Sequence, residues 1–308
     1  MALPTSCPLC GAGADQQSVI VTRVYGDDTG RAVFACAACD VRYLFPKLTP
    51  DEEQRLYAKE FESFMAKRSG PNAGWDGPER HIAVNEAQRQ RRMKHLMGLI
   101  SPNSRILEIG SGSGFMLYPL AAEGHECVAI EPSGIFSEYV SGRGIRCFRA
   151  INELLDCGNV TGGFDLVLHY YVMEHLADPV AFLKSQLGLL KPGGRIVFEV
   201  PNANDALTVL YEIPAYARFI WVVSHRWYFT EKSLAATIAK AGGRGEIRLD
   251  QRYDLSNHIV WARDGRPGGM GRFTHALGDE IEELYRQALI RARVCDTLIG
   301  VVQKAPDY

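Results

Sequence analysis

The stretch Arg105-Ile-Leu-Glu-Ile-Gly-Ser-Gly-Ser-Gly-Phe115 decides the fold. Its first half is a short apolar run, which is typical of a buried strand. Its second half has glycine at alternate positions and leads into an apolar, helix-like segment that ends near Ala122. A strand, a glycine-rich turn and a helix in this order form the first unit of a nucleotide-binding α/β domain. Glycine lets the backbone approach a ligand closely, and a helix N-terminus favours an anionic group there.

The spacing of these glycines differs from that of the dinucleotide-binding proteins. The pattern is G-x-G-x-G with Glu108 just before it, and it is not the dinucleotide fingerprint G-x-G-x-x-G. In a nucleotide-binding unit, an acid that grips a ribose follows the second strand about 20 residues later. The apolar run 127–130 ends in Glu131, Pro132 and Ser133. The sequence therefore predicts that Glu131 accepts hydrogen bonds from ribose hydroxyls.

Three more strands follow, at 146–148, 164–168 and 195–200, with recognisable motifs between them. These are Tyr171-Val-Met-Glu-His175 leading to Leu176-Ala-Asp-Pro179, and then Lys191-Pro-Gly-Gly194. In order and spacing, the run over roughly residues 80–308 resembles the class I S-adenosylmethionine-dependent methyltransferases. The resemblance implies an α/β fold with a doubly wound, seven-stranded, mostly parallel sheet, in which the last strand runs antiparallel to its neighbours. The element His225-Arg-Trp-Tyr-Phe-Thr230 is similar to one found in ubiquinone-pathway-like members.

This resemblance also implies S-adenosylmethionine as the cofactor. The glycines are expected near its methionine part, with Glu108 facing the amino group. His169 and Tyr170 are expected along the cofactor edge, and Asn152 near the adenine. The residues assigned to cofactor binding are Glu108, Gly110, Gly112, Gly114, Phe115, Glu131, Pro132, Ser133, Asn152, His169 and Tyr170.

The N-terminal 45 residues carry two C-x-x-C pairs, Cys7 with Cys10 and Cys36 with Cys39. The residues between the pairs read as two strands of a hairpin. Two such pairs suit a tetrahedral zinc site with four cysteine ligands, and we favour zinc over a redox C-x-x-C. Four thiolates leave no open coordination position, so the zinc is predicted to be structural. So small a module has too little core to fold without the metal.

The remaining organisation is a connector and a methyltransferase domain. Residues 46–78 connect the zinc ribbon (1–45) to the domain (79–308), and either Tyr57, Phe61 and Trp75 form a lid or the connector is a plain linker. Residues 79–100 are expected to form one long helix, whose cationic residues are assigned to a solvated face rather than to a phosphate site. Those cations are Arg89, Arg91, Arg92 and Lys94.

Residues 201–230 form an aromatic-rich segment, expected as an insertion on the substrate side of the pocket. The alternative is an amphipathic helix that covers a sheet edge or a subunit interface. Thr230 is expected to cap the helix that follows.

The candidate catalytic residues are Glu174, His175 and His225. If the methyl acceptor is a hydroxyl, a base must remove its proton, and histidine titrates near pH ~6.5. In related quinone and small-RNA methyltransferases, an E-x-x-E-H pattern with a later histidine binds a divalent metal. Here Tyr171 replaces the first acid, so we favour a metal-free site with His175 or His225 as the base. The alternative is that each histidine only holds a loop.

Composition limits the partners. The chain has 308 residues and a formal net charge of −2, so it lacks the basic footprint of a nucleic-acid-binding protein. No apolar run reaches the ~20 residues that span a bilayer, and the N-terminus lacks a signal-peptide core. We therefore expect a cytoplasmic enzyme with a small-molecule acceptor, without nucleic acid or membrane as partner; the oligomeric state is not predicted.

The predicted reaction is methylation of a hydroxyl of a sugar or natural product. The alternatives are a zinc-ribbon ribosomal-RNA methyltransferase, a C- or N-methyltransferase of a sugar, and a non-catalytic scaffold with the same fold. The segment after the fourth strand, His169-Tyr-Tyr-Val172, is not the D/N-P-P-Y motif of exocyclic amino methylation.

Overall fold

The computed structural model describes residues 2–56, 77–158, 160 and 162–306. The aromatic residues considered for a lid, Tyr57, Phe61 and Trp75, lie outside this part of the chain. Within it, no helix combines the length and the apolar character needed to cross a membrane.

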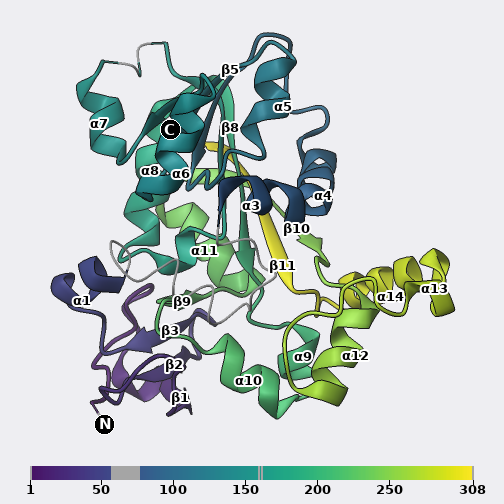
Figure 1. Ribbon diagram of the computed structural model, residues 1–308. Helices are drawn as coiled ribbons and strands as arrows, with labels where there is room; N and C mark the ends of the chain where they lie inside the picture. The colour runs from purple at the N-terminus through teal and green to yellow at the C-terminus, as the bar shows by residue number, and fades with distance from the viewer. Residues whose placement is uncertain (1, 57–76, 159, 161, 307–308) are drawn as a thin grey trace.

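A seven-stranded sheet forms the centre of the larger part of the molecule (Figure 1), in the order β10-β11-β8-β7-β4-β5-β6. The strand β11 is antiparallel to both β10 and β8, and the other pairs are parallel. This confirms the predicted fold class and the antiparallel last strand. The strands are β4 (Arg105–Ile109), β5 (Glu126–Ile130), β6 (Arg146–Phe148), β7 (Phe164–Tyr170), β8 (Leu190–Pro201), β10 (Gly243–Asp250) and β11 (Thr297–Lys304).

Helices cover both faces of this sheet and bury two apolar clusters. On one face, Leu183 of α8 and Leu234 of α11 share a cluster with Phe198 of β8. On the other, Leu96 of α4 and Leu117 of α5 share a cluster with strand residues. The helices of this part are α3 (Pro78–Val84), α4 (Glu86–Leu96), α5 (Leu117–Ala122), α6 (Gly134–Gly142), α7 (Ile151–Asp156), η3 (Met173–His175), α8 (Pro179–Leu189), α9 (Ala206–Val209), α10 (Pro214–Ile220), α11 (Glu231–Lys240), α12 (Leu255–Asp264), α13 (Thr274–Leu277) and α14 (Asp279–Arg291).

The single helix expected over residues 79–100 is instead two helices, α3 and α4, that meet at Asn85. This residue has φ −99° and ψ 5°, which is outside the helical region. Its side-chain Nδ2 donates to the carbonyl oxygen of His81 at 2.8 Å. A side-chain amide that bonds locally to the backbone competes with the helical ladder, which accounts for the break.

The N-terminal module is a second, four-stranded sheet, in the order β1-β2-β3-β9. Its own strands are β1 (Gln17–Val21), β2 (Ala32–Cys36) and β3 (Arg42–Phe45), and the short helices beside them are η1 (Ala14–Gln16) and α1 (Pro50–Arg55). The fourth strand, β9 (Trp227–Tyr228), comes from the segment 201–230 and pairs with β3, with Arg42 opposite Tyr228. Figure 1 shows this small sheet, in purple, below the large one. Two distant parts of the chain therefore build one sheet.

Candidate functional site

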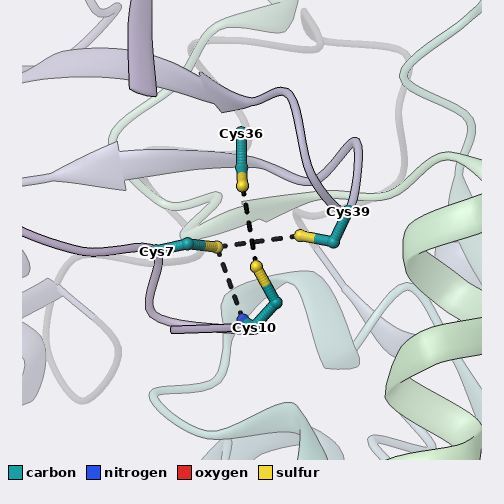
Figure 2. Close-up of side chains that lie close together, drawn as sticks. All are labelled: Cys7, Cys10, Cys36 and Cys39. Carbon is teal, nitrogen blue, oxygen red and sulfur yellow. Dashed lines mark hydrogen bonds between the residues drawn. The ribbon is translucent and has the colours of Figure 1, made fainter. Parts of the chain in front are cut away.

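The four N-terminal cysteines converge on one point (Figure 2). The Sγ atoms of Cys7 and Cys39 lie 3.7 Å apart, as do those of Cys10 and Cys36. All four Sγ atoms lie within 4.8 Å of one another. A tetrahedron with Zn–S bonds of about 2.3 Å has S–S edges of about 3.8 Å. Two edges of the cluster match this value, and the four side chains suit a zinc ion in number, type and spacing.

Hydrogen bonds to the sulfur atoms support the same interpretation. The backbone N–H of Cys10 donates to Cys7 Sγ at 3.5 Å, and Gln17 Nε2 donates to Cys36 Sγ at 3.6 Å. Burial opposes ionisation of Cys36, but N–H donors, with the backbone of Cys39 first, lower its pKa to about 7. Burial raises the pKa of Cys7 to about 11. Because zinc binds thiolates, a cation at the centre is what would ionise the more buried thiols.

The glycine turn after β4 adopts backbone angles that favour glycine. Gly110, Gly112 and Gly114 have φ values of 73°, 53° and 77°. A Cβ atom on Gly110 would lie 2.7 Å from Val172 Cγ2, and one on Gly112 would lie 3.3 Å from His81 Cε1. The turn is thus packed closely between α3 and the segment that follows β7. A larger residue at Gly110 would displace the turn from its neighbours.

Glu131 joins the end of β5 to this turn. Its Oε2 accepts from the backbone N–H of Gly112 at 2.7 Å, and its Oε1 accepts from the backbone N–H of Ser133 at 2.8 Å. Only 7% of Glu131 is exposed. The structure therefore brings together the two motifs that sequence analysis assigned to the cofactor, the glycine turn and the acid after the second strand.

Glu108 lies under the glycine turn and is 2% exposed. Its Oε2 has no hydrogen-bond partner within the described residues. Burial raises the pKa of Glu108 to about 8, in spite of the nearby Arg92 guanidinium. A buried carboxyl of this kind suits a ligand that brings its own ammonium group. This orphaned oxygen is the observation that best fits the amino group of S-adenosylmethionine.

Arg92 is buried, so its assignment to a solvated face was wrong. Only 6% of Arg92 is exposed. Its guanidinium carbon lies 3.9 Å from the ring centroid of Tyr170 and 5.5 Å from that of Phe115. Its Nε donates to Glu199 Oε2 at 2.9 Å. Arg92 therefore places positive charge among three residues assigned to the cofactor, Glu108, Phe115 and Tyr170.

The neighbouring Arg91 is partly buried and forms ion pairs with two buried carboxylates. It contacts Glu199 at 2.7 Å and also pairs with Asp250. The signal for both arginines was present in the sequence, because Glu199 stands in the apolar strand 195–200. A carboxylate inside a buried strand requires a cation nearby.

The remaining residues assigned to the cofactor lie in different places. His169 is fully buried on the face covered by α8, where its ring stacks on Phe198 at 4.7 Å and meets the edge of Phe182 at 5.1 Å. Successive side chains of a strand point to opposite faces, so His169 and Tyr170 do not share one side of the sheet. Burial lowers the pKa of His169 to about 3. Asn152 is exposed in the first turn of α7, and Pro132 accepts a hydrogen bond from Arg149 through its carbonyl oxygen.

The three candidate catalytic side chains meet where β7 ends. Glu174 and His175 lie in η3, and His225 lies just before β9. The rings of His175 and His225 are 4.9 Å apart, and His175 Nε2 lies 3.9 Å from Glu174 Oε1. His175 Nδ1 lies 2.8 Å from the carbonyl oxygen of Ser224. Because a carbonyl oxygen only accepts, Nδ1 carries the hydrogen and Nε2 of the neutral ring is left as an acceptor.

The chain from Tyr171 to His175 links this cluster to the glycine turn. Tyr171 has a φ of 57°, and its hydroxyl lies 2.8 Å from Thr297 Oγ1. The position that would carry the first acid of an E-x-x-E-H pattern therefore faces β11. Val172, the next residue, is the one that packs against Gly110. Glu174 and His175 follow it directly, so the cluster lies beside the predicted cofactor site.

Comparison with known proteins agrees with this geometry. The family model for the methyltransferase domain matches residues 85–244. A ubiquinone biosynthesis O-methyltransferase from Cereibacter sphaeroides is 31% identical over 168 residues, a match that covers 51% of this chain and 66% of that protein. A protein of the same name from Dinoroseobacter shibae is 31% identical over 199 residues, covering 57% of this chain and 79% of that protein.

One solved structure supports the fold. It is a complex of a methyltransferase with the Haloferax volcanii Trm112 methyltransferase activator. The match covers 82% of this chain and 98% of the matched chain, with a TM-score of 0.51 and 15% sequence identity. At that identity the likeness concerns the fold alone. Family model, relatives and sheet topology agree, and the chain belongs to the methyltransferase domain family, as an S-adenosylmethionine-dependent methyltransferase with the class I fold.

Proposed function

We propose that this protein transfers the methyl group of S-adenosylmethionine to a hydroxyl of a small molecule, of the sugar or natural-product class. The observation that carries the proposal is the convergence of Glu174, His175 and His225, whose ligand atoms lie within 4.8 Å of one another. An oxygen acceptor also agrees with the names of the two relatives, which are O-methyltransferases.

The donor half of the site would hold the cofactor through groups already described. Glu108 would face its amino group, Arg92 its carboxylate, and Glu131 its ribose hydroxyls. The glycine turn would lie against the methionine part. When bound, S-adenosylmethionine supplies an electrophilic methyl group. The protein's task is to hold the acceptor in line with that methyl group and to remove the acceptor's proton.

The acceptor half would supply the base. His175 is the better candidate, because the Ser224 carbonyl fixes the tautomer in which Nε2 accepts a proton. The carboxylate of Glu174, 3.9 Å from that nitrogen, would stabilise the imidazolium as it forms. His225 packs edge-on against His175 and would either orient it or take the proton itself. At least one of the two histidines is therefore proposed as the general base.

The same three side chains support a second candidate mechanism. Two imidazoles and a carboxylate form a donor set that binds divalent transition metals. In that case the cluster would hold a cation that lowers the pKa of the acceptor hydroxyl. We favour the metal-free base because Tyr171 is bonded to Thr297 and does not join the cluster.

The test is turnover with a panel of hydroxylated acceptors, followed through the demethylated cofactor that is released. At least one of the two variants His175→Asn and His225→Asn should have a turnover about 10²- to 10⁴-fold lower than that of the parent. Cofactor affinity should stay within about twofold, since both rings are assigned to the acceptor half of the site. His275→Asn, an exposed position on α13, is the matched control.

Three outcomes would contradict the proposed base. Parental turnover in both variants would show that no histidine base operates. Loss of activity in a chelator that leaves the zinc content of the ribbon unchanged, restored by a divalent cation, would instead favour the metal mechanism. A purely structural histidine would lower the melting temperature and the cofactor affinity together with turnover.

A further inference from the structure

The N-terminal ribbon contacts the segment that carries His225 on both sides of this residue. Before it, the backbone N–H of Tyr25 donates to the carbonyl of Trp221 at 2.8 Å, and the N–H of Val223 donates to the carbonyl of Tyr25 at 2.9 Å. After it, the N–H of Leu44 in β3 donates to the carbonyl of Arg226 at 3.0 Å. The loop with His225 is thus held at two points by the ribbon backbone.

The residues next to His225 also form hydrogen bonds with the segment that carries the other two catalytic candidates, Glu174 and His175. The N–H of Arg226 donates to the carbonyl of Glu174 at 2.8 Å. The indole Nε1 of Trp227 donates to the carbonyl of Leu176 at 2.8 Å, and the Ser224 carbonyl receives the His175 ring. Residues from both sides of His225 therefore hold η3 in place.

One side chain of the ribbon, Arg42 of β3, connects β3 to the start of the segment 201–230. Its guanidinium donates to the carbonyl oxygen of Ala203 and, at 2.6 Å, to Asn204 Oδ1. The backbone N–H of Ala203 donates in turn to the carbonyl of Phe229 at 2.7 Å. Arg42 is also opposite Tyr228 in the pairing of β3 with β9. It therefore contacts both ends of the segment 201–230.

Burial reinforces these contacts. Val24, Val33 and Leu44 of the ribbon share one apolar cluster with Trp221 and Tyr228 of the insertion. The strand β9 has only two residues, and within the described chain its sheet partner is β3. So short a strand has no stability of its own, because an isolated pair of strands is already marginal in water. Its position depends on the ribbon.

We propose that the ribbon positions the acceptor half of the site: its β3 strand, locked by Arg42, holds the loop with His225 and, through the Ser224 carbonyl, the ring of His175. This inference rests on the proposed function for its catalytic consequence. The structural part, that the two rings take their places from the ribbon, stands independently of any acceptor. Arg42 is a positioning residue in this arrangement.

The test compares Arg42→Met with Arg42→Lys and with Arg23→Met, the last a control at an exposed ribbon position. Histidine ring nitrogens are observed by NMR, with the signals assigned through His175→Asn and His225→Asn. Zinc content and melting temperature show whether each variant is folded. Cofactor affinity is measured by titration, and turnover is measured with the acceptor found in the panel.

In Arg42→Met, we expect the His175 and His225 signals to shift or broaden while those of His95 and His258 stay unchanged. Turnover should fall by about 10- to 100-fold, as a displaced catalytic group would cause, with cofactor affinity within about twofold. Arg42→Lys, which keeps a cation near the Ala203 carbonyl, should recover part of both effects. Arg23→Met should match the parent.

Unchanged histidine signals in a folded, zinc-loaded Arg42→Met would overturn the inference. If that variant does not fold, Asn204→Ala removes one of the two groups that accept hydrogen bonds from Arg42. The His175 and His225 signals of Asn204→Ala then test the inference in the same way. Shifted signals with parental turnover would support the positioning role and count against the histidine base. The failure of one proposal is thus distinguishable from the failure of the other.

Discussion

Replacing Glu131 tests the donor half of the site most directly. Both carboxylate oxygens accept a backbone N–H, one from Gly112 at 2.7 Å and the other from Ser133 at 2.8 Å. Glu131→Ala removes both of these bonds together with the proposed bonds to the ribose. Glu131→Gln is not a mild change here, because one of its two positions becomes an NH₂ group that faces an N–H donor.

The expected loss follows from the strength of hydrogen bonds to a charged group, about 1.5–3 kcal/mol each. Loss of one such contact to the cofactor would weaken binding by about 10- to 150-fold, at about 1.4 kcal/mol per tenfold. Isothermal titration with S-adenosylmethionine measures this affinity. Thermal melting without ligand reports separately how far the glycine turn itself has been loosened.

Glu126→Gln provides the matched control. Glu126 begins the same strand, β5, and its side chain is 60% exposed and forms an ion pair with Arg105 at 2.9 Å. Surface pairs of this kind contribute little, so cofactor affinity should not change. Parental affinity in a folded Glu131→Ala would refute the assignment of Glu131 to the cofactor.

Three further predictions concern metal, stability and pH. Protein purified without added metal should contain about one zinc per chain by elemental analysis, and Cys39→Ser should lower both the zinc content and the melting temperature. Glu199→Gln should lower the free energy of unfolding in urea by about 3–5 kcal/mol, because it leaves the buried Arg92 without its carboxylate partner and Arg91 with Asp250 alone. Although burial opposes it, pairing with Arg92 and Arg91 lowers the pKa of Glu199 in the folded state. Its stabilisation is therefore present above its unfolded pKa of about 4.3 and is lost as the pH falls, so Glu199→Gln should show a flatter acid limb of stability against pH.

The sequence predicted the sheet well because the relevant signals are local. Each parallel strand is an apolar run that ends in a distinctive turn, such as the glycine turn after Ile109 or the acid at position 131. The strand order itself came from the resemblance to class I methyltransferases, because the handedness rule for parallel strands joined by helices restricts each crossover but does not determine the order of the strands. The convergence of Glu131 with Gly112 follows from the same rule, because the carboxyl ends of neighbouring parallel strands meet at one edge.

The buried charges were missed because polarity alone was used to assign the face of the helix. Arg91 and Arg92 stand in a run of cationic residues that is typical of a solvated surface. The structure shows that Glu199, inside β8, and Asp250, at the end of β10, require them. To decide between a solvated and a buried position for these arginines, one must know how α4 packs on the sheet. The partner Glu199 lies more than 100 residues away from Arg91 in the sequence, so this packing is not a local signal.

The sequence named Glu174, His175 and His225 as candidates, but it did not predict the strand β9 that follows His225, and the physical reason is different. The donor half is made by motifs that are each continuous in the sequence, so their residue types and spacing are sufficient to find them. The acceptor half depends on β9, a strand of two residues, and on its pairing with β3 some 185 positions earlier, since Tyr43 lies opposite Trp227. Strand propensity cannot identify so short a strand, because its place is determined by its partner rather than by its own sequence. The donor half can therefore stay constant while changes in the ribbon or the insertion move His225. On the proposed function, acceptor choice should then depend on ribbon residues such as Arg42, which lie outside the cofactor-binding motifs.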